Sequence, residues 1–289
     1  MDVVVIFNGL GNQLSQYSFY LAKQKYCKNC TCIFDSRGVN NHNGFELNRL
    51  FGIEIPNTIK NRILYWLFQL KKRKIVSSLL SLLKIRIIKE DNKYLFNEDL
   101  LVKSPLGINF YWGGWPSEKH FKAIEKEVKG TFSFPNSEED EVFNKMKTEI
   151  EKNPTSVSLH IRRGDYLKKT NSIYQFGGVA TDDYFKKAIQ YTIKHINNPS
   201  FYVFSDDINW CREHFIGNEY HFVDCNNGLN SWRDLYLMSL CRHHINSNST
   251  FSWWGAWLCE YDDKIVITPE EYIKDLSTPD VYPAEWIKL

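Results

Sequence analysis

The stretch of sequence that decides the fold is Val157-Ser158-Leu159-His160-Ile161-Arg162-Arg163-Gly164-Asp165-Tyr166. Aliphatic side chains alternate over its first five residues, which predicts a buried strand over 157–161. The polar run that follows contains a glycine and ends the strand. Because successive side chains of a strand point to opposite faces, we expect His160 and Arg162 on one side of the sheet and Arg163 on the other. The two arginines therefore have different roles.

Short strands and helices alternate downstream of this stretch. Alternation of this kind specifies a mostly parallel sheet with helices on both faces. Such sheets bind ligands at the carboxyl ends of their strands. We expect strands at 201–204, 220–223, 243–245 and 264–267, and helices at 182–195, 210–215, 231–241 and 251–259.

The N-terminal part of the chain starts in the same way. A strand at 3–7, a helix at 12–26 and a second strand at 31–34 predict a parallel β-α-β unit. A length of 289 residues suits two domains of about 150 residues each. We place the boundary near Asn153-Pro154, which gives domains 1–152 and 153–289. The predicted fold class is α/β, with two Rossmann-type domains, parallel sheets and a cleft between the domains.

The composition excludes some classes of protein. Hydrophobic residues make up 43% of the chain and charged residues 24%, as in ordinary globular proteins. The 36 basic and 34 acidic residues leave a formal charge of +2, which argues against a dedicated nucleic-acid binder. Seven scattered cysteines are typical of reduced thiols, and Cys27, Cys30 and Cys32 lack a second cluster that would complete a zinc site. Asp2 and a short first apolar run do not fit a secretory leader, so we expect a cytoplasmic protein.

One segment carries the positive charge. From Lys60 to Lys89 there are nine basic side chains and no acidic one, so the rest of the chain has 27 basic and 34 acidic residues, a balance of −7. Leucine, isoleucine, tryptophan and phenylalanine are interspersed with these charges, which predicts one or two basic amphipathic helices. Two interpretations stay open: the apolar stripes pack inside the protein, or residues 60–89 make a peripheral membrane contact. The apolar runs are shorter than the roughly 20 residues that cross a bilayer.

Polar residues follow three of the predicted strands. Arg162 offers a planar, permanently charged fork of donors that suits a diphosphate, whereas Arg163 can instead hold Asp165 or another carboxylate. Asp206 or Asp207, after the strand at 201–204, can accept a hydrogen bond from a purine edge or a ribose hydroxyl, or cap the next helix.

The third strand end is Asn246-Ser247-Asn248-Ser249-Thr250-Phe251. It leads directly into a helix. Ser249 and Thr250 can cap that helix, and they can also offer hydroxyl and amide groups to an anion at its N-terminus.

The first glycine turn, Asn8-Gly9-Leu10-Gly11-Asn12-Gln13-Leu14, approaches the dinucleotide pattern G-x-G-x-x-G. Leu14 stands where the third glycine belongs, although Asp35 lies at a suitable distance for a ribose contact. A nicotinamide site and a purely structural turn both stay open. The turn offers backbone amides at a helix N-terminus beside two carboxamides, Asn12 and Gln13.

Taken together, these motifs resemble the α-1,2-fucosyltransferases of glycosyltransferase family 11. The resemblance rests on the heptad 160–166, on Gly9-Leu10-Gly11-Asn12-Gln13, and on the run from Asn248 to Leu258. Weaker motifs fall in the family's order at Phe45-Glu46-Leu47, at 114–121 and at 282–289.

The resemblance implies a GT-B-like fold with an acceptor domain at 1–152 and a GDP-fucose domain at 153–289. It implies an inverting transfer of L-fucose from GDP-β-L-fucose to the 2-hydroxyl of a terminal galactoside, on an oligosaccharide or a lipid-linked glycan, with no metal and no other cofactor. Two alternatives are a nicotinamide-dependent oxidoreductase that uses the Gly9 turn and a non-catalytic GDP-binding module.

Carried over residue by residue, the resemblance implies that Arg162 grips the diphosphate and that His160 and Asp206 read guanine. Asn12 approaches the bridging oxygen beside Gly11. The base that takes the acceptor's proton stays open among Asp165, Asp35 and Glu46. The predicted catalytic residues are Arg162, Asp165 and Asn12, and the predicted donor-binding residues are His160, Arg162, Arg163, Asp206, Ser249, Thr250, Phe251 and Gly11.

Overall fold

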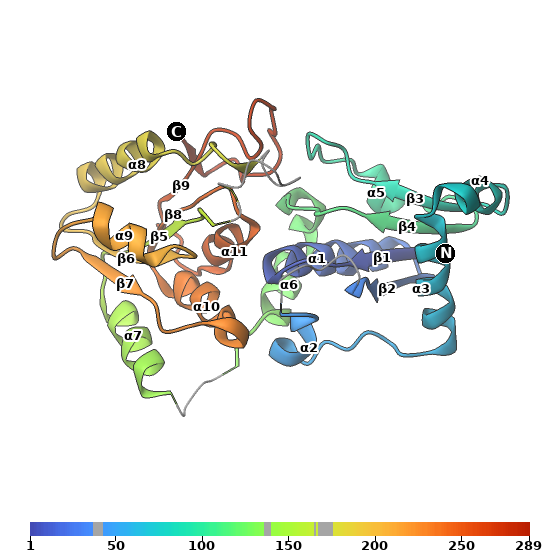
Figure 1. The fold of residues 1–289 in the computed structure, drawn as a ribbon, viewed down its shortest axis with the longest axis horizontal. Helices are drawn as coiled ribbons and strands as arrows, with labels where there is room; N and C mark the ends of the chain where they lie inside the picture. The colour runs from blue at the N-terminus through green and yellow to red at the C-terminus, as the bar shows by residue number, and fades with distance from the viewer. Residues whose placement is uncertain (37–42, 136–139, 165, 167–175) are drawn as a thin grey trace. The chain divides into compact units, whose positions relative to one another are not determined.

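The computed structural model of the chain describes residues 1–36, 43–135, 140–164, 166 and 176–289 (Figure 1). The chain divides into two compact units, Met1–Pro135 and Asn136–Leu289. Two units were predicted, but the division comes earlier than the expected boundary at 152. The reason is helix α7 (Glu141–Lys152), whose Phe143 and Ile150 are buried in the core of the second unit.

The first unit contains a four-stranded sheet in the order β2-β1-β4-β3, in which every pairing is parallel. Its strands are β1 (Asp2–Ile6), β2 (Cys30–Phe34), β3 (Ile85–Lys89) and β4 (Ile108–Trp112). Its helices are α1 (Leu10–Tyr26), α2 (Glu46–Phe51), α3 (Ile59–Lys71), α4 (Lys74–Leu82), α5 (Asp99–Val102) and α6 (Glu125–Thr131), with short 3₁₀ turns η2 (Glu118–His120) and η3 (Lys122–Ile124).

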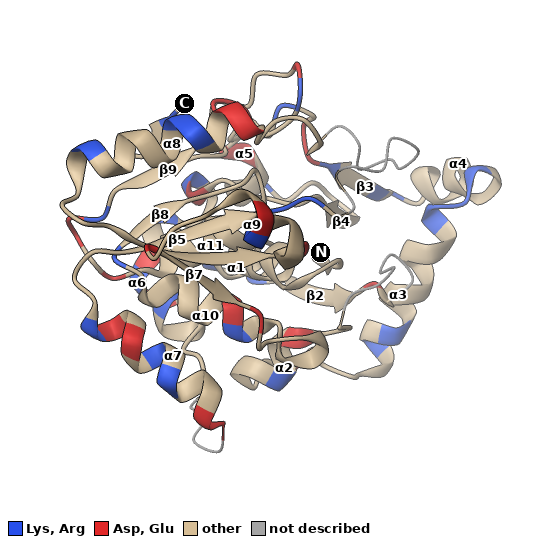
Figure 2. Cartoon of the chain, turned by 60° about the vertical axis from the view of Figure 1, so that its left-hand side comes forward, with Lys and Arg blue, Asp and Glu red and all other residues tan. Residues whose placement is uncertain are grey.

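The basic segment from Lys60 to Lys89 forms the two expected helices, α3 and α4, and then strand β3. The strand was not predicted. Ile85, Ile87 and Ile88 are β-branched residues that favour extended backbone, and β3 pairs with β4 along its whole length. Figure 2 marks the Lys and Arg positions of α3 and α4 in blue along the ribbon.

The second unit contains a six-stranded parallel sheet in the order β10-β9-β8-β5-β6-β7. Its strands are β5 (Ser156–Ile161), β6 (Ser200–Ser205), β7 (Tyr220–Val223), β8 (His243–Ile245), β9 (Val266–Thr268) and β10 (Ile287–Lys288). After α7, its helices are α8 (Asp182–His195), α9 (Ile208–His214), η6 (Gly228–Asn230), α10 (Trp232–Leu240) and α11 (Thr250–Leu258).

Helices cover both faces of this sheet, because its strands carry apolar side chains on both faces. Leu159 and Ile161 of β5 and Val203 of β6 pack with α8 in one cluster, whereas Tyr202 and Phe204 of β6 pack with α7 and α10 in another. The alternation along each strand therefore separates two cores. It also fixes which side chains near the strand ends can share a face.

No helix in the described part of the chain is both long and apolar enough to cross a bilayer. The seven cysteines are free thiols, and five of them are buried.

Candidate functional site

The site begins where β5 ends, between β8 on one side and β6 on the other. Ser247, a fully buried residue after β8, joins two of these strands. Its hydroxyl donates to the carbonyl oxygen of His160 at 2.7 Å and accepts from the backbone amide of Arg162 at 3.0 Å. The three predicted strand ends are therefore neighbours, and the first is hydrogen-bonded to the third.

Asp206 links the end of β6 to the loop after β5. Its carboxylate accepts from the backbone amides of Arg163 and Gly164, at 2.9 and 3.1 Å, and contacts the guanidinium of Arg162 at 3.3 Å. A side chain at Gly164 would displace the Asp206 carboxylate, because a Cβ atom there would lie 2.7 Å from Asp206 Oδ2. In the structure the Asp206 carboxylate orders this loop and orients Arg162, and its contact with guanine stays a prediction.

Arg163 points to the opposite face, as the alternation predicted. Its guanidinium stacks over the Trp210 ring at 3.6 Å, and its Nε lies 3.4 Å from Asp207. Asp207 also caps α9 by accepting from the Trp210 amide at 3.4 Å. These contacts join the loop after β5 to α9, and the role of Arg163 in donor binding stays a prediction. Of the two arginines, Arg162 is therefore the one whose side chain lies on the same face of the strand as His160.

His160 is a buried, uncharged imidazole at the end of β5. Burial, with a smaller contribution from the charge of Arg162, lowers its pKa to about 3. Its ring lies 6.0 Å from that of Phe251 in α11, and its Nδ1 has no hydrogen-bond partner within the described ranges. A neutral imidazole with a vacant nitrogen can donate to or accept from a nucleobase or a sugar hydroxyl.

Two further buried carboxamides follow β8. Asn246 has no partner among the described residues for either its oxygen or its nitrogen, and Asn248 has none for its oxygen. The Asn248 amide group donates to the carbonyls of Phe176 and Tyr272, at 2.9 and 3.0 Å, so its orientation is fixed. Leaving such a group unsatisfied costs about 1–3 kcal/mol. Asn246 and Asn248 belong to the predicted third strand end, but no role was predicted for either of them.

Helix α11 begins in the same region. Ser249 is its N-cap, as predicted, and accepts from the amide of Phe251 at 3.3 Å. Thr250 is its first residue and is partly exposed. The N-terminus of a helix carries a partial positive charge and unsatisfied amides, so this end of the sheet favours an anion.

The predicted site residues Gly11 and Asn12 belong to the first unit. Gly11 is buried in the first turn of α1, and Asn12 is partly exposed. Gln13 is structural: its side chain donates to the carbonyls of Asn8 and Gly44, at 2.7 and 2.8 Å, and accepts from the Glu46 amide at 3.0 Å.

The carboxylates considered as bases differ in their surroundings. Asp35 is 1% exposed and accepts from Gln69 at 2.8 Å and from Lys72 at 3.0 Å. Glu46 is buried and pairs with Arg49 at 3.1 Å. Asp165 lies outside the described residues, so its predicted catalytic role stays a prediction.

Glu90 is a partly buried carboxylate that was not among the predicted site residues. It follows β3 directly, and its oxygens accept from the amides of Gly114 and Trp115, at 2.7 and 2.9 Å. Burial raises its pKa to about 8, with a smaller contribution from Asp91, while the two amide hydrogen bonds oppose the shift. The feature of the sequence that could have indicated Glu90 is its position as an acidic residue directly after an isoleucine-rich run.

Two cavities lie apart from this set of residues. One, of about 660 Å³, is in the first unit and is lined by Lys71, Lys72, Arg86, Lys89 and Trp112 among others. Three of its cations already have partners: Lys71 donates to Ser77 O, Lys72 to Asp35 and Arg86 to Leu106 O.

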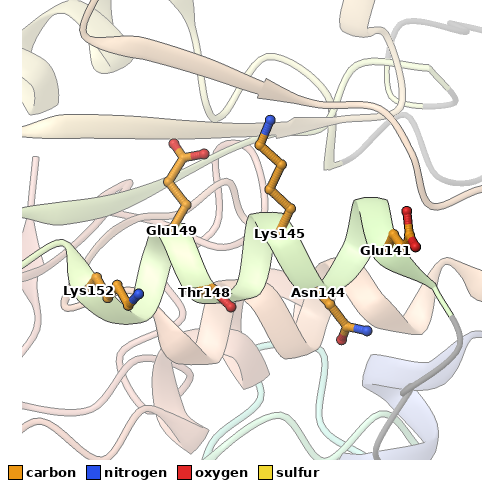
Figure 3. A pocket seen from close by; sticks show the side chains of 6 residues that line it. All are labelled: Glu141, Asn144, Lys145, Thr148, Glu149 and Lys152. Atoms are coloured by element: carbon orange, nitrogen blue, oxygen red, sulfur yellow. The ribbon is translucent and has the colours of Figure 1, made fainter.

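The second cavity, of about 540 Å³, runs along one helix, α7 (Figure 3). It is lined by Glu141, Asn144, Lys145, Thr148, Glu149 and Lys152. It shares no residue with the three strand ends. Within the described ranges, no group of three or more His, Cys, Asp or Glu side chains is arranged to hold a metal ion.

Comparison with known proteins gives a consistent result. Residues 55–289 match the model of glycosyl transferase family 11. An α-1,2-colitosyltransferase of Escherichia coli is 32% identical over 308 aligned residues, which cover 100% of this chain and 99% of that protein. A galactoside α-(1,2)-fucosyltransferase 1 of Saimiri boliviensis boliviensis is 28% identical over 139 residues, 46% of this chain and 38% of that protein.

Among solved structures, the fucosyltransferase NodZ from Bradyrhizobium is similar in fold, with a TM-score of 0.53 at 12% identity, over 91% of this chain and 95% of that one. The two parallel α/β units agree with a GT-B-like fold, and the family match makes the chain a glycosyltransferase. This chain belongs to glycosyl transferase family 11.

Proposed function

We propose that this chain transfers L-fucose from GDP-β-L-fucose to the 2-hydroxyl of a terminal galactoside, with inversion at the sugar's anomeric carbon. The first unit binds the acceptor and the second binds the nucleotide donor. The observation that carries the proposal is the juxtaposition of Arg162, the buried His160 and the N-terminus of α11 on adjacent strand ends.

The donor side is supported by complementary chemistry. A nucleoside diphosphate needs positive charge for its phosphates and hydrogen-bonding groups for its base and ribose. Arg162 supplies the charge, with the amides at Thr250 beside the Ser249 cap. The vacant Nδ1 of His160 and the unsatisfied carboxamide of Asn246 supply hydrogen-bonding groups close by.

The transfer step follows from these roles. The acceptor oxygen forms a bond to the anomeric carbon as the bond from that carbon to the β-phosphate oxygen breaks. The leaving oxygen keeps the electron pair, and the acceptor's proton passes to a base. Arg162 and the α11 amides stabilise the charge that builds on the β-phosphate, as fixed donors do in other transferases. Because these groups supply the stabilisation, we expect a chelator to leave the rate unchanged.

The linkage and the donor sugar are separate questions. The names of both relatives specify an α-1,2 linkage, which supports attack by a 2-hydroxyl. Their sugars differ: colitose is L-fucose without its 3-hydroxyl. Because the colitosyltransferase matches the whole chain, transfer of colitose from its GDP derivative is the second candidate function.

A competition assay distinguishes the two candidates. Equal amounts of GDP-fucose and GDP-colitose are incubated with the protein and a panel of β-galactosides, and the products are separated and their linkages assigned by NMR. We expect α-1,2-fucosylated galactoside to dominate. A site that hydrogen-bonds the 3-hydroxyl should discriminate strongly against the sugar that lacks it. A product that is mainly colitosylated would overturn the fucose assignment and keep the family chemistry.

Two controls separate the proposal from its rivals. A nicotinamide oxidoreductase would bind NAD, whereas we expect GDP and not NAD to raise the melting temperature. A non-catalytic module would bind GDP but release no GDP from GDP-fucose when the acceptor is present.

A further inference from the structure

Helices α3 and α4 each carry an apolar stripe that faces solvent. On α3 the stripe is Ile59, Ile63 and Trp66, and on α4 it is Ile75, Leu79, Leu82 and the adjoining Leu83. The spacing of four and then three residues is that of one helix face. These side chains are between 54% and 94% exposed.

The opposite faces of the same helices already fill the core of the first unit. Leu64 and Phe68 of α3 and Leu80 of α4 are buried in a cluster with residues of β1, β3 and β4. The outward stripes are therefore not needed to hold the helices to the sheet. Large exposed apolar patches on soluble proteins usually mark interaction sites.

Charge identifies the partner. Nine basic residues and no acidic one lie between Lys60 and Lys89, and Lys60, Arg62, Arg73, Lys74 and Lys84 are exposed. A second copy of this chain docked on the same stripes would bring like charges together. An anionic surface, by contrast, would attract the lysines and arginines while the apolar side chains enter its non-polar layer.

We propose that α3 and α4 bind this protein to the surface of an anionic lipid bilayer. The helices lie in the interface, with Ile75, Leu79 and Leu82 inserted below the headgroups. Trp66, an amphipathic aromatic side chain, suits the headgroup level. A membrane-bound glycan would then be presented to the unit that carries this surface.

The test uses the full-length protein and sedimentation with vesicles of phosphatidylglycerol or of phosphatidylcholine. We expect the wild type to bind phosphatidylglycerol vesicles at least tenfold more strongly than phosphatidylcholine, with binding weakened by high salt. The variant Ile75→Ser/Leu79→Ser/Leu82→Ser should lose at least tenfold in binding. Inorganic phosphate should compete weakly, because it offers no apolar layer.

A matched variant controls for exposed apolar area in general. Ile193→Ser/Ile216→Ser/Leu229→Ser removes three exposed aliphatic side chains of the second unit, and it should bind vesicles like the wild type. Light scattering tests the alternative partner, a second copy of this chain, because it detects a dimer. Wild-type protein that dimerises and ignores vesicles, or an α4 variant that still binds them fully, would overturn the membrane assignment.

A second inference comes from the end of β3 and rests on the proposed transfer reaction. Gly114 lies between Glu90 and Asn12: a Cβ atom placed on it would be 3.5 Å from Glu90 Oε2 and 3.8 Å from Asn12 Oδ1. Gly113 allows this approach, because a Cβ atom there would lie 2.5 Å from the Cβ of Glu90. The segments after β1, β3 and β4 thus place a carboxylate and Asn12, a predicted catalytic residue, on either side of Gly114.

We infer that Glu90 is the base that takes the proton of the acceptor hydroxyl. As the oxygen bonds to the anomeric carbon, its proton moves to the Glu90 carboxylate, and GDP leaves with the electron pair of the broken bond. Asp35 is less suited, since its carboxylate already accepts from Gln69 and pairs with Lys72. Glu46 is less suited because it pairs with Arg49.

Glu90 also holds the backbone at Gly114 and Trp115, so the test must separate the two roles. Glu90→Gln keeps an oxygen that can accept from these amides. We expect it to lower kcat at least a hundredfold, within the usual range for a general base, while the affinity for GDP stays within twofold. Glu90→Asp should retain part of the rate.

The pH profile is the readout that a structural role would not change. Burial and the charge of Asp91 raise the pKa of Glu90, the amides of Trp115 and Gly114 lower it, and Glu90 in turn raises the pKa of Tyr94. The wild-type rate should rise with pH and level off above about 8, because only the ionised carboxylate accepts a proton. Glu90→Gln with a near-normal rate and the same rising limb would refute this role. A wild type that transfers no sugar would instead refute the proposed function.

Discussion

At the residue scale, the alternation of side chains along β5 separates two adjacent arginines. Arg162 was predicted to hold the diphosphate, and Arg163 was predicted on the other face, either as a donor-binding residue or beside a carboxylate. The structure shows Arg163 stacked on Trp210 beside Asp207, and Arg162 oriented by Asp206. The sequence could predict this sidedness because strand period is a local property. It could not predict that Asp206 clamps the loop, because that contact joins residues more than forty positions apart.

The two arginines provide a matched pair for mutation. Arg162→Ala should lower kcat with GDP-fucose by at least a hundredfold, the effect of removing one donor that stabilises developing charge. Arg163→Ala removes an equal charge from a group engaged with α9, so we expect less than a tenfold loss. Steady-state kinetics with saturating donor make the comparison. Equal losses for both variants would show that Arg162 has no special relation to the phosphates.

His160 provides a test of burial at the same strand end. Its ordinary pKa is 6.5 and its folded pKa is about 3, so an unfolded chain binds a proton between these values and the folded chain does not. Its contribution to stability is therefore present above pH 6.5 and is lost as pH falls. Between pH 7 and pH 5 the free energy of unfolding of the wild type should fall by about 2 kcal/mol more than that of His160→Gln. Urea unfolding at each pH measures the difference. Parallel curves would show that the imidazole gains a proton in the folded chain as readily as in the unfolded chain, and would contradict its burial.

At the scale of elements, the second unit was more predictable than the first. Strands β7 and β8 and helix α8 have the predicted bounds, and the other predicted elements differ by at most two residues at either end. Each combines a clear apolar run with polar residues at its ends. In the first unit β3 was hidden inside a basic segment that looked helical, and β4 was not predicted. Glu90 was missed with them, since its neighbours Gly114 and Trp115 come from the loop after β4.

A glycine between two elements provides the test at this scale. Gly164 lets the loop after β5 approach β6 closely enough for Asp206 to accept two of its amides. Gly164→Ala should displace the loop, weaken GDP binding at least tenfold and leave the helix content unchanged. Gly130→Ala is the control, because nothing lies within 4 Å of a Cβ atom there. Calorimetric titration with GDP measures the effect. Normal GDP affinity in Gly164→Ala would remove this loop from the donor site.

At the scale of the whole molecule, two separate cores predict two unfolding events. Leu64 belongs to the core of the first unit and Leu159 to that of the second. Truncation of either leucine to alanine should lower the free energy of unfolding of its own unit by about 2–5 kcal/mol. Leu64→Ala and Leu159→Ala therefore show which calorimetric transition belongs to which unit. Because the proposed donor residues other than Gly11 and Asn12 belong to Asn136–Leu289, GDP should raise mainly the transition that Leu159→Ala lowers. A shift confined to the transition sensitive to Leu64→Ala would place the nucleotide on the first unit and contradict the assignment of donor and acceptor.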